Sequence, residues 1–266
     1  MTTQFIIVLV FTFVINLISS LSYSVRWVGV RTRKVAISFS IFNIMVLVSR
    51  TSNSVQAPLL AKRIENNIHA GIFEATADFR YIILAASLAT LAAAFLFPTF
   101  QEIMTRGVNS FSKVKSIPKL VMLAFTKKGR NAIIQSFRMP RLADFKLLLQ
   151  WQKMSKKIFV YNVIIIGIIT VGVLASLNAG YLNPDLRTTC STLSASVNGI
   201  ATILLIIFVD PYMSLLTDEV IEKKFDMIQF RTIIAIMLFS RFLGTLLAQV
   251  LLLPFSYFIL FIAEII

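Results

Sequence analysis

The sequence contains little of the chemistry on which most enzymes depend. Only one of its 266 residues is a cysteine, Cys190, and only one is a histidine, His69. A single cysteine excludes an intrachain disulfide, and no group of cysteines and histidines has the spacing of a metal site. His69 lies in a mixed polar segment, where a surface position is the favoured interpretation. The fold is therefore expected to be independent of redox state, and no metal or other cofactor is expected.

The motifs of several enzyme classes are also absent. No Gly-rich loop follows a strand pattern, and no Gly-x-Ser-x-Gly elbow occurs. Intramembrane hydrolases and phosphatases need paired acids, or a nucleophile with its base, and the apolar part of this chain contains only Asp210 and Glu264, both near run ends. We therefore do not expect an enzyme.

Charged residues are scarce, at 14% of the chain, whereas an average soluble domain contains about 25%. Hydrophobic residues make up 57%, and the mean hydropathy is +0.82. This composition excludes an ordinary soluble domain and predicts an integral membrane protein. The net charge of +14 is then a matter of membrane topology, and nucleic acid is not expected as a partner.

Six apolar runs approach the roughly 20 residues that a helix needs to cross about 30 Å of hydrocarbon. They predict an all-α fold, a six-helix transmembrane bundle forming a single membrane domain over residues 1–266. Pro58 is expected to bend or end the second helix, and Asp210-Pro211 to close the fifth, while the sixth can continue past Pro254. The expected spans are 5–25, 35–60, 81–99, 158–177, 190–209 and 232–253.

The longest segment between spans, 101–157, contains thirteen Lys or Arg and two acids. Its apolar residues recur with helical period beside basic ones, as in helices that lie in the membrane plane against anionic lipid. We therefore predict a basic amphipathic cytoplasmic or interfacial arm between the third and fourth helices, with anionic membrane lipids as partners. Topology setting and non-specific lipid binding are favoured for it over capture of a specific ligand.

The distribution of basic residues predicts the orientation. The first apolar run lacks the basic leader of a cleaved signal peptide, so it is expected to remain as a helix. With the N-terminus outside, twenty of the 26 Lys and Arg lie on the inner side and four on the outer side. This follows the positive-inside rule and predicts a multi-pass plasma-membrane protein with both termini outside.

The remaining two basic residues, Arg50 and Arg241, lie within apolar runs. A central arginine raises the free energy of insertion by about 2.5–3.5 kcal/mol, so such residues usually face a bundle interior or a wet cavity. The guanidinium group matches phosphate oxygens and stays charged. Either each arginine is held by helix carbonyls or by Asp210 and only locks the bundle, or an anionic ligand neutralises them; with one well-placed acid, the ligand is favoured. The other candidate binding residues, on polar helix faces, are Asn16, Asn43, Asn53, Gln56 and Asn198.

A short internal similarity relates the two arginines. The segment 44–50, which ends at Arg50, is similar to 236–241, which ends at Arg241. Transporters are often built from repeated halves with a site near the bilayer midplane. Apolar runs align easily, so chance is the favoured explanation, but the similarity suggests that both arginines face one cavity.

Residues 29–58, GVRTRKVAISFSIFNIMVLVSRTSNSVQAP, resemble the Amj family of bacterial membrane proteins, the alternate lipid II flippases that stand in for MurJ. The similarity extends to the polar first helix ending at Arg26, the basic middle and the helix containing Ser240-Arg241. The resemblance implies movement of lipid II, the undecaprenyl-pyrophosphate-linked disaccharide pentapeptide, from the cytoplasmic to the outer leaflet of the bacterial plasma membrane during cell-wall synthesis. It assigns no residue roles, so the candidate sites rest on the residues themselves.

Two other functions stay open at this point. A non-transporting membrane scaffold or partner subunit of the cell-wall machinery would use the basic arm, and an intramembrane prenyl-phosphate enzyme is disfavoured. No nucleotide-binding motif is present, so a membrane potential, an ion gradient or consumption of lipid II outside is expected to drive transport, with Asp210 as a candidate for ion pairing or coupling. The oligomeric state, including a homo-oligomer, is left open.

Overall fold

The structure, a computed structural model, describes residues 3–71, 76–116, 119, 122–123, 125–140 and 154–266, and the regular elements in these ranges are helices. Their order along the chain is α1 (Thr3–Leu21), α2 (Tyr23–Thr32), α3 (Val35–His69), α4 (Thr76–Val114), α6 (Lys127–Ile134), α8 (Lys156–Leu182), a 3₁₀ turn (Pro184–Leu186), α9 (Arg187–Leu204), a π-helical segment (Leu205–Val209), α10 (Asp210–Ile221) and α11 (Met227–Ile265).

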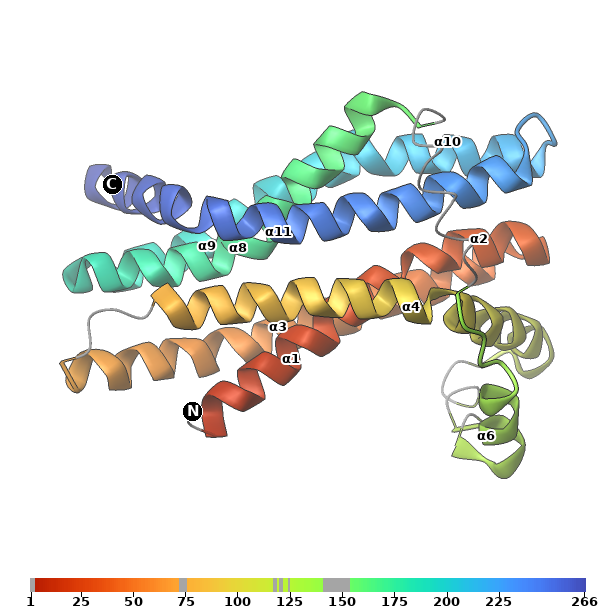
Figure 1. The fold of residues 1–266 in the computed structure, drawn as a ribbon, viewed down its shortest axis with the longest axis horizontal. Helices are drawn as coiled ribbons and strands as arrows, with labels where there is room; N and C mark the ends of the chain where they lie inside the picture. Colours follow the sequence, from red (N-terminus) through yellow and green to blue (C-terminus); the bar gives the residue numbers. More distant parts are fainter. Residues whose placement is uncertain (1–2, 72–75, 117–118, 120–121, 124, 141–153) are drawn as a thin grey trace.

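The long helices form two halves with the same packing plan. In the first half α1 packs against both α3 and α4, which hardly touch each other, and in the second half α8 packs in the same way against α9 and α11. The halves run in opposite directions: α1 leads away from the end that carries both termini, and α8 leads back toward it (Figure 1). The shorter α6 lies at the other end of the bundle. Halves that pack alike and run in opposite directions are also found in transporters built from inverted-topology repeats.

The helices identify a multi-pass membrane protein, but the predicted count of six spans is not confirmed. Five helices in the described part are long and apolar enough to cross a bilayer: Thr3–Thr32, Thr76–Phe111, Lys156–Leu182, Pro184–Ile221 and Met227–Ile265. The expected second span, 35–60, lies within α3, where the described apolar stretch is Val35–Ser49. The side chains of Arg50 and of several residues after it lie outside the described part of the chain, and the backbone stays helical to His69.

Two of the prolines that were expected to interrupt or end helices do not end them in the structure. Pro58 does not end α3, which continues for eleven more residues, since a proline inside a membrane helix is tolerated when neighbours satisfy the freed backbone groups. Pro211 does not close the fifth span either, because it lies in the first turn of α10, where a missing N–H has no helical acceptor to lose. The sixth helix does continue past Pro254, as predicted.

The first span continues beyond its expected end but is interrupted at Ser22. There Ser22 Oγ donates to Ser19 O at 2.7 Å and Ser24 Oγ donates to Leu21 O at 2.7 Å. Hydroxyl groups that bond to the preceding turn in this way bend helices. The interruption separates α1 from α2, and Arg26 on α2 is buried, with 6% of its surface exposed.

The basic arm begins as an extension of α4. Residues 101–114 continue that helix beyond Pro98, and α6 follows, so part of the predicted arm is helical. Glu102 holds this region together through ion pairs with Arg31 at 3.4 Å, Arg106 at 3.8 Å and Arg138 at 3.7 Å. Residues 141–153 lie outside the described part of the chain, and the position of the arm against lipid stays a prediction.

A close crossing of α8 and α11 fixes the second half. Gly244 lies so near α8 that a Cβ atom added to it would be 2.7 Å from Val163 O and 2.8 Å from Ile166 Cβ. Small residues allow membrane helices to approach in this way. Beside the crossing Asn162 Nδ2 donates to Ser240 Oγ at 2.7 Å, which ties the same two helices within a buried environment.

We expect Gly244→Ala to destabilise the protein, because the added methyl group must push α8 and α11 apart. Overpacking of this kind typically lowers the free energy of unfolding by about 1–3 kcal/mol. The matched control is Gly107→Ala on α4, since a Cβ there meets nothing within 4 Å. Thermal unfolding in detergent should show a lower midpoint for the first variant only; equal midpoints would mean that the crossing is not tightly packed.

Candidate functional site

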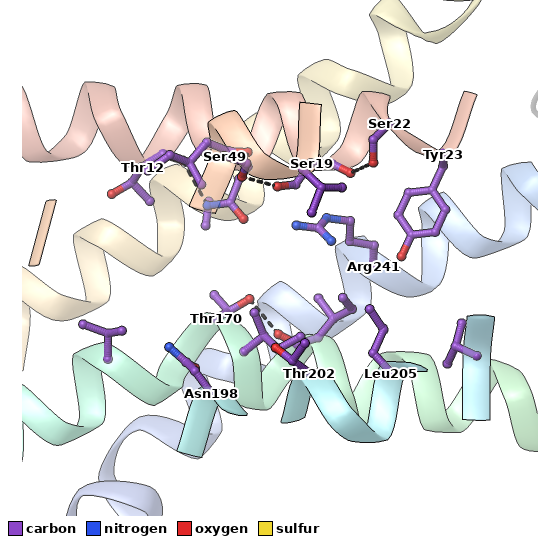
Figure 2. Close-up of a pocket in the computed structure, with 18 of the residues that line it drawn as sticks. Thr12, Ser19, Ser22, Tyr23, Ser49, Thr170, Asn198, Thr202, Leu205 and Arg241 are labelled. Carbon is purple, nitrogen blue, oxygen red and sulfur yellow. Dashed lines mark hydrogen bonds between the residues drawn. The ribbon is translucent and has the colours of Figure 1, made fainter. Parts of the chain in front are cut away.

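A cavity of about 800 Å³ lies between the two halves. Its walls come from α1, α2, α3 and α4 on one side and from α8, α9, α10 and α11 on the other (Figure 2). Apolar clusters pack toward each end of the bundle, one containing Phe5 and Ile259 and the other containing Val30 and Phe230. Many polar side chains of the bundle, including Asn16, Ser19 and Thr202, line this space between two apolar regions.

The wall formed by α1 and α3 consists mainly of hydroxyl and amide groups. Ser19 and Ser49 share a hydrogen bond of 2.6 Å between their Oγ atoms, and Gln56 Nε2 donates to Thr12 Oγ1. Asn16 Nδ2 bonds to Thr12 O in its own helix at 2.9 Å. The polar face expected on the first helix thus pairs with the polar face of the second, and both line the cavity.

Arg241 is the cation in the middle of this site. Its Nε atom donates to Ser20 Oγ at 3.0 Å, and Figure 2 shows the end of the guanidinium group lying between the walls. In the part of the chain that the structure describes, Arg241 makes no ion pair. A guanidinium group with free N–H donors in a partly desolvated cavity is suited to bind an oxyanion.

A second cation, Arg26, lines the same cavity nearer the end that carries α6. Its Nη2 atom is 2.7 Å from Asp210 Oδ1, and the side chains are 5% and 38% exposed respectively. Asp210 is the only carboxylate among the described lining residues. Asp210, which was considered from sequence as a partner for Arg50 or Arg241, is therefore paired with Arg26 instead.

Asn198 places an amide group against the cavity wall without a hydrogen-bond partner. Its Oδ1 atom is buried, and in the described part of the chain it accepts no hydrogen bond. It fits there because Gly172 of α8 has no side chain; a Cβ at that position would be 2.4 Å from Oδ1. A buried polar atom with no partner is rare and calls for an explanation, such as a water molecule or an ion.

The cavity opens to the surface of the bundle between α3 and α9. Ile203 and Ile206 line it and are 55% and 53% exposed, and Asn43 on the opposite side also lines it and is exposed. The helices α3 and α9 hardly touch each other.

Six of the eight residues predicted from sequence as candidate binding or coupling residues line the cavity: Asn16, Asn43, Gln56, Asn198, Asp210 and Arg241. Arg50 and Asn53 belong to α3, but their side chains lie outside the described part of the structure. The expectation that Arg50 and Arg241 face one cavity therefore stays a prediction. The similarity of 44–50 to 236–241 joins the second helix of one half to the third of the other, so it does not mark equivalent positions.

Sequence reasoning missed Arg26, which was counted only among the cytoplasmic charges that set topology. One signal was available, because Asn16, Ser19, Ser20 and Tyr23 form a polar face at helical spacing and Arg26 is the next position on it. The expected end of the span at Val25 concealed this continuity. The bend at Ser22 keeps the face directed toward the cavity.

The fold and the cavity define a multi-pass helical membrane protein with an internal cavity that contains cationic side chains. The chain belongs to the Amj family, whose profile, described as "Alternate to MurJ", matches residues 11–263. It is 34% identical over 264 residues to the protein named lipid II flippase Amj of Bacillus subtilis (strain 168), covering 99% of this chain and 98% of that relative. No solved structure matches.

These comparisons confirm the family resemblance noted in residues 29–58. The relative is named a lipid II flippase, a protein that moves a lipid across a membrane. The family is therefore one of transporters, which agrees with the expectation that the chain is not an enzyme. The comparisons do not assign a role to any single residue.

Proposed function

We propose that the chain is a lipid II flippase that moves the undecaprenyl-pyrophosphate-linked peptidoglycan precursor from the cytoplasmic to the outer leaflet. The observation that carries this proposal is the guanidinium group of Arg241, which has no carboxylate partner in the described chain and faces a cavity lined by both polar and apolar side chains. The pyrophosphate of lipid II is the anionic group that this cation would neutralise. The name of the Bacillus subtilis relative supports the choice of substrate.

The shape of the cavity suits a substrate that is polar at one end and prenyl at the other. Its volume of about 800 Å³ lies within the usual range of ligand sites, about 300–1,000 Å³. The opening between α3 and α9, with Ile203 and Ile206 exposed at its edge, would let the prenyl chain remain in lipid. The headgroup would then contact Asn16, Asn43, Gln56, Asn198 and Arg241, with Arg50 and Asn53 approaching from α3.

The proposed topology has six spans, with α3 as the second, both termini outside and the arm in the cytoplasm. Both termini lie at one end of the bundle and α6 at the other (Figure 1), which supports an even number of spans. The arm then meets the anionic inner leaflet, in keeping with its thirteen basic residues. Within a bilayer every backbone N–H and C=O group must be hydrogen-bonded by the protein. The continuous helix α3 meets this requirement, which is consistent with its role as the second span.

The inverted halves support an alternating-access cycle, in which one half moves against the other around a fixed site. Polar contacts join the halves toward both ends. Near the termini Asn67 Nδ2 donates to Tyr181 Oη at 2.9 Å and Arg187 lies 3.7 Å from Glu65. Near the arm the contact is Arg26 with Asp210. Transport would require these contacts to open in turn.

The direct test uses purified protein in vesicles that contain fluorescent lipid II in the inner leaflet. The proposal expects the protein alone to make the lipid accessible to an impermeant quencher, and vesicles with a heat-denatured sample to show no change. A scaffold or partner subunit would leave the lipid inaccessible although the protein is folded and inserted. That result would contradict the proposal.

We expect Gly172→Ala to slow this transport about tenfold, because the new Cβ displaces Asn198 from its place on the wall and one hydrogen bond to the substrate is lost. The matched control is Gly199→Ala, which borders the same cavity but has nothing within 4 Å of its Cβ. Initial rates in the vesicle assay check the prediction. Equal rates for the two variants would exclude a binding role for Asn198.

A further inference from the structure

The side chain of Arg26 is held from two elements at once. Toward α3, its guanidinium carbon is 5.3 Å from the ring centre of Phe39 and 5.6 Å from that of Phe42. Toward α10, Nη2 donates to Asp210 Oδ1 at 2.7 Å and Nη1 donates to Ser214 Oγ at 3.4 Å. The aromatic rings fix the cation by cation–π attraction, whereas its hydrogen bonds go to groups that an anion can replace.

Asp210 lies where the second half is locally irregular. The π-helical segment Leu205–Val209 precedes it, and Pro211 follows it in the first turn of α10. Such π segments inside helices are frequent at functional sites. The contact of Arg26 with Asp210 and Ser214 joins α2 of one half to α10 of the other, so its loss would free α10 to move relative to the first half.

We propose that Arg26 is a second binding residue for the substrate pyrophosphate, and that Asp210 occupies its donors until the substrate arrives. This inference rests on the proposed function and extends it to the order of events. A phosphate oxygen takes the place of Asp210 Oδ1 on Nη2, with no bond made or broken other than hydrogen bonds. The exchange releases α10 and separates the two halves at the end near the arm.

The two arginines then act in sequence. Ser20, which holds Arg241, and Arg26 are six residues apart on α1 and α2, or about 9 Å along the helix direction. A pyrophosphate that enters from the arm end reaches Arg26 first and Arg241 next. Ser22 and Tyr23, which lie between Ser20 and Arg26 in the sequence, line the cavity along this path.

Affinity measurements separate this exchange from a purely structural ion pair. With purified protein in nanodiscs and undecaprenyl pyrophosphate as the probe, Arg26→Gln should weaken binding about tenfold. Asp210→Asn should strengthen binding several-fold, because it removes the competing charge but keeps an acceptor for Arg26. A structural brace predicts changes of the same sign, or no change, for both variants, and that result would overturn the proposal.

A matched control exists within the first half. Arg63 and Asp78 form an ion pair at 2.6 Å, and Arg63 also lies 4.5 Å from the ring centre of Phe5. This pair has the same chemistry but does not border the cavity, so Asp78→Asn should leave the affinity unchanged. Inorganic pyrophosphate serves as a second probe, and weaker binding by it shows that the lipid-linked form is the ligand; equal binding would overturn that assignment.

A distance measurement reports the predicted movement. Spin labels on Cys residues introduced at Arg33 and Ile221, in a Cys190→Ser background, should move apart when undecaprenyl pyrophosphate binds. In Asp210→Asn the same movement should need a lower concentration of this lipid. Arg241-dependent binding with an unchanged distance would overturn the exchange but leave the proposed function intact. Absence of any Arg241-dependent binding would overturn both.

Discussion

Arg241→Ala is expected to abolish growth rescue in bacteria that are depleted of their main lipid II flippase, although the variant reaches the membrane at normal levels. Removal of the guanidinium group deletes the donors that face the cavity, and loss of a two-donor contact with a charged group reduces transport by about 100-fold or more. Arg50→Ala is expected to fail in the same assay if its side chain reaches the same cavity. Growth after depletion, with membrane levels measured by immunoblot, checks both results.

The control for this loss of charge is Arg80→Ala, because Arg80 is exposed and does not line the cavity. A scaffold function predicts the opposite pattern. In that case neutralisation of the basic residues of the arm from Lys113 to Lys157 abolishes rescue, while the variants of Arg50 and Arg241 grow normally. Full rescue by both arginine variants would remove these residues from the mechanism.

Asp210→Leu is expected to lower the free energy of unfolding by about 3 kcal/mol, because it leaves Arg26 buried without its counter-ion. The carboxylate is 38% exposed toward the cavity, so the loss falls at the lower end of the range for buried pairs. The double variant Arg26→Leu, Asp210→Leu should recover most of the stability, since no isolated charge remains. Unfolding followed in detergent gives the three values.

The comparison for that prediction is the surface pair of Lys224 with Glu222, which is 2.6 Å long but has side chains 71% and 56% exposed. Solvent screens such pairs, so Glu222→Gln should change the unfolding free energy by less than about 1 kcal/mol. A loss as small as this in Asp210→Leu would show that Arg26 is solvated through the cavity. A double variant no more stable than the single one would contradict the ion-pair explanation.

The helical fold and much of the cavity could be predicted from sequence, because apolar run length and polar periodicity are local properties. The polar face of the first helix, with Asn16, and the polar position Asn198 in the fifth both lie on the wall that the structure forms. The central position of Arg241 followed from the apolar residues on each side of it. Such patterns survive folding because lipid leaves polar groups no other place than the interior.

What sequence could not predict depends on contacts between distant segments. The pairing of Arg26 with Asp210 joins residues 184 positions apart, and no local pattern indicates which of several arginines takes the one available acid. Pro58 was expected to bend or end its helix and Pro211 to close the fifth span, and neither ends a helix, because a proline does so only when neighbouring groups cannot compensate. The crossing of α8 and α11 at Gly244 likewise depends on the packing of both halves.

Photocrosslinking of the substrate to the cavity tests the central claim most directly. A photoreactive residue placed at Thr202, on the cavity wall, should label lipid II in membranes, and Arg241→Ala should reduce that labelling strongly. The same residue placed at Val250 on α11, which is 70% exposed and outside the cavity lining, should give only background. Equal labelling at the two positions, or labelling at Thr202 that is unaffected by Arg241→Ala, would contradict a path for the pyrophosphate through this cavity.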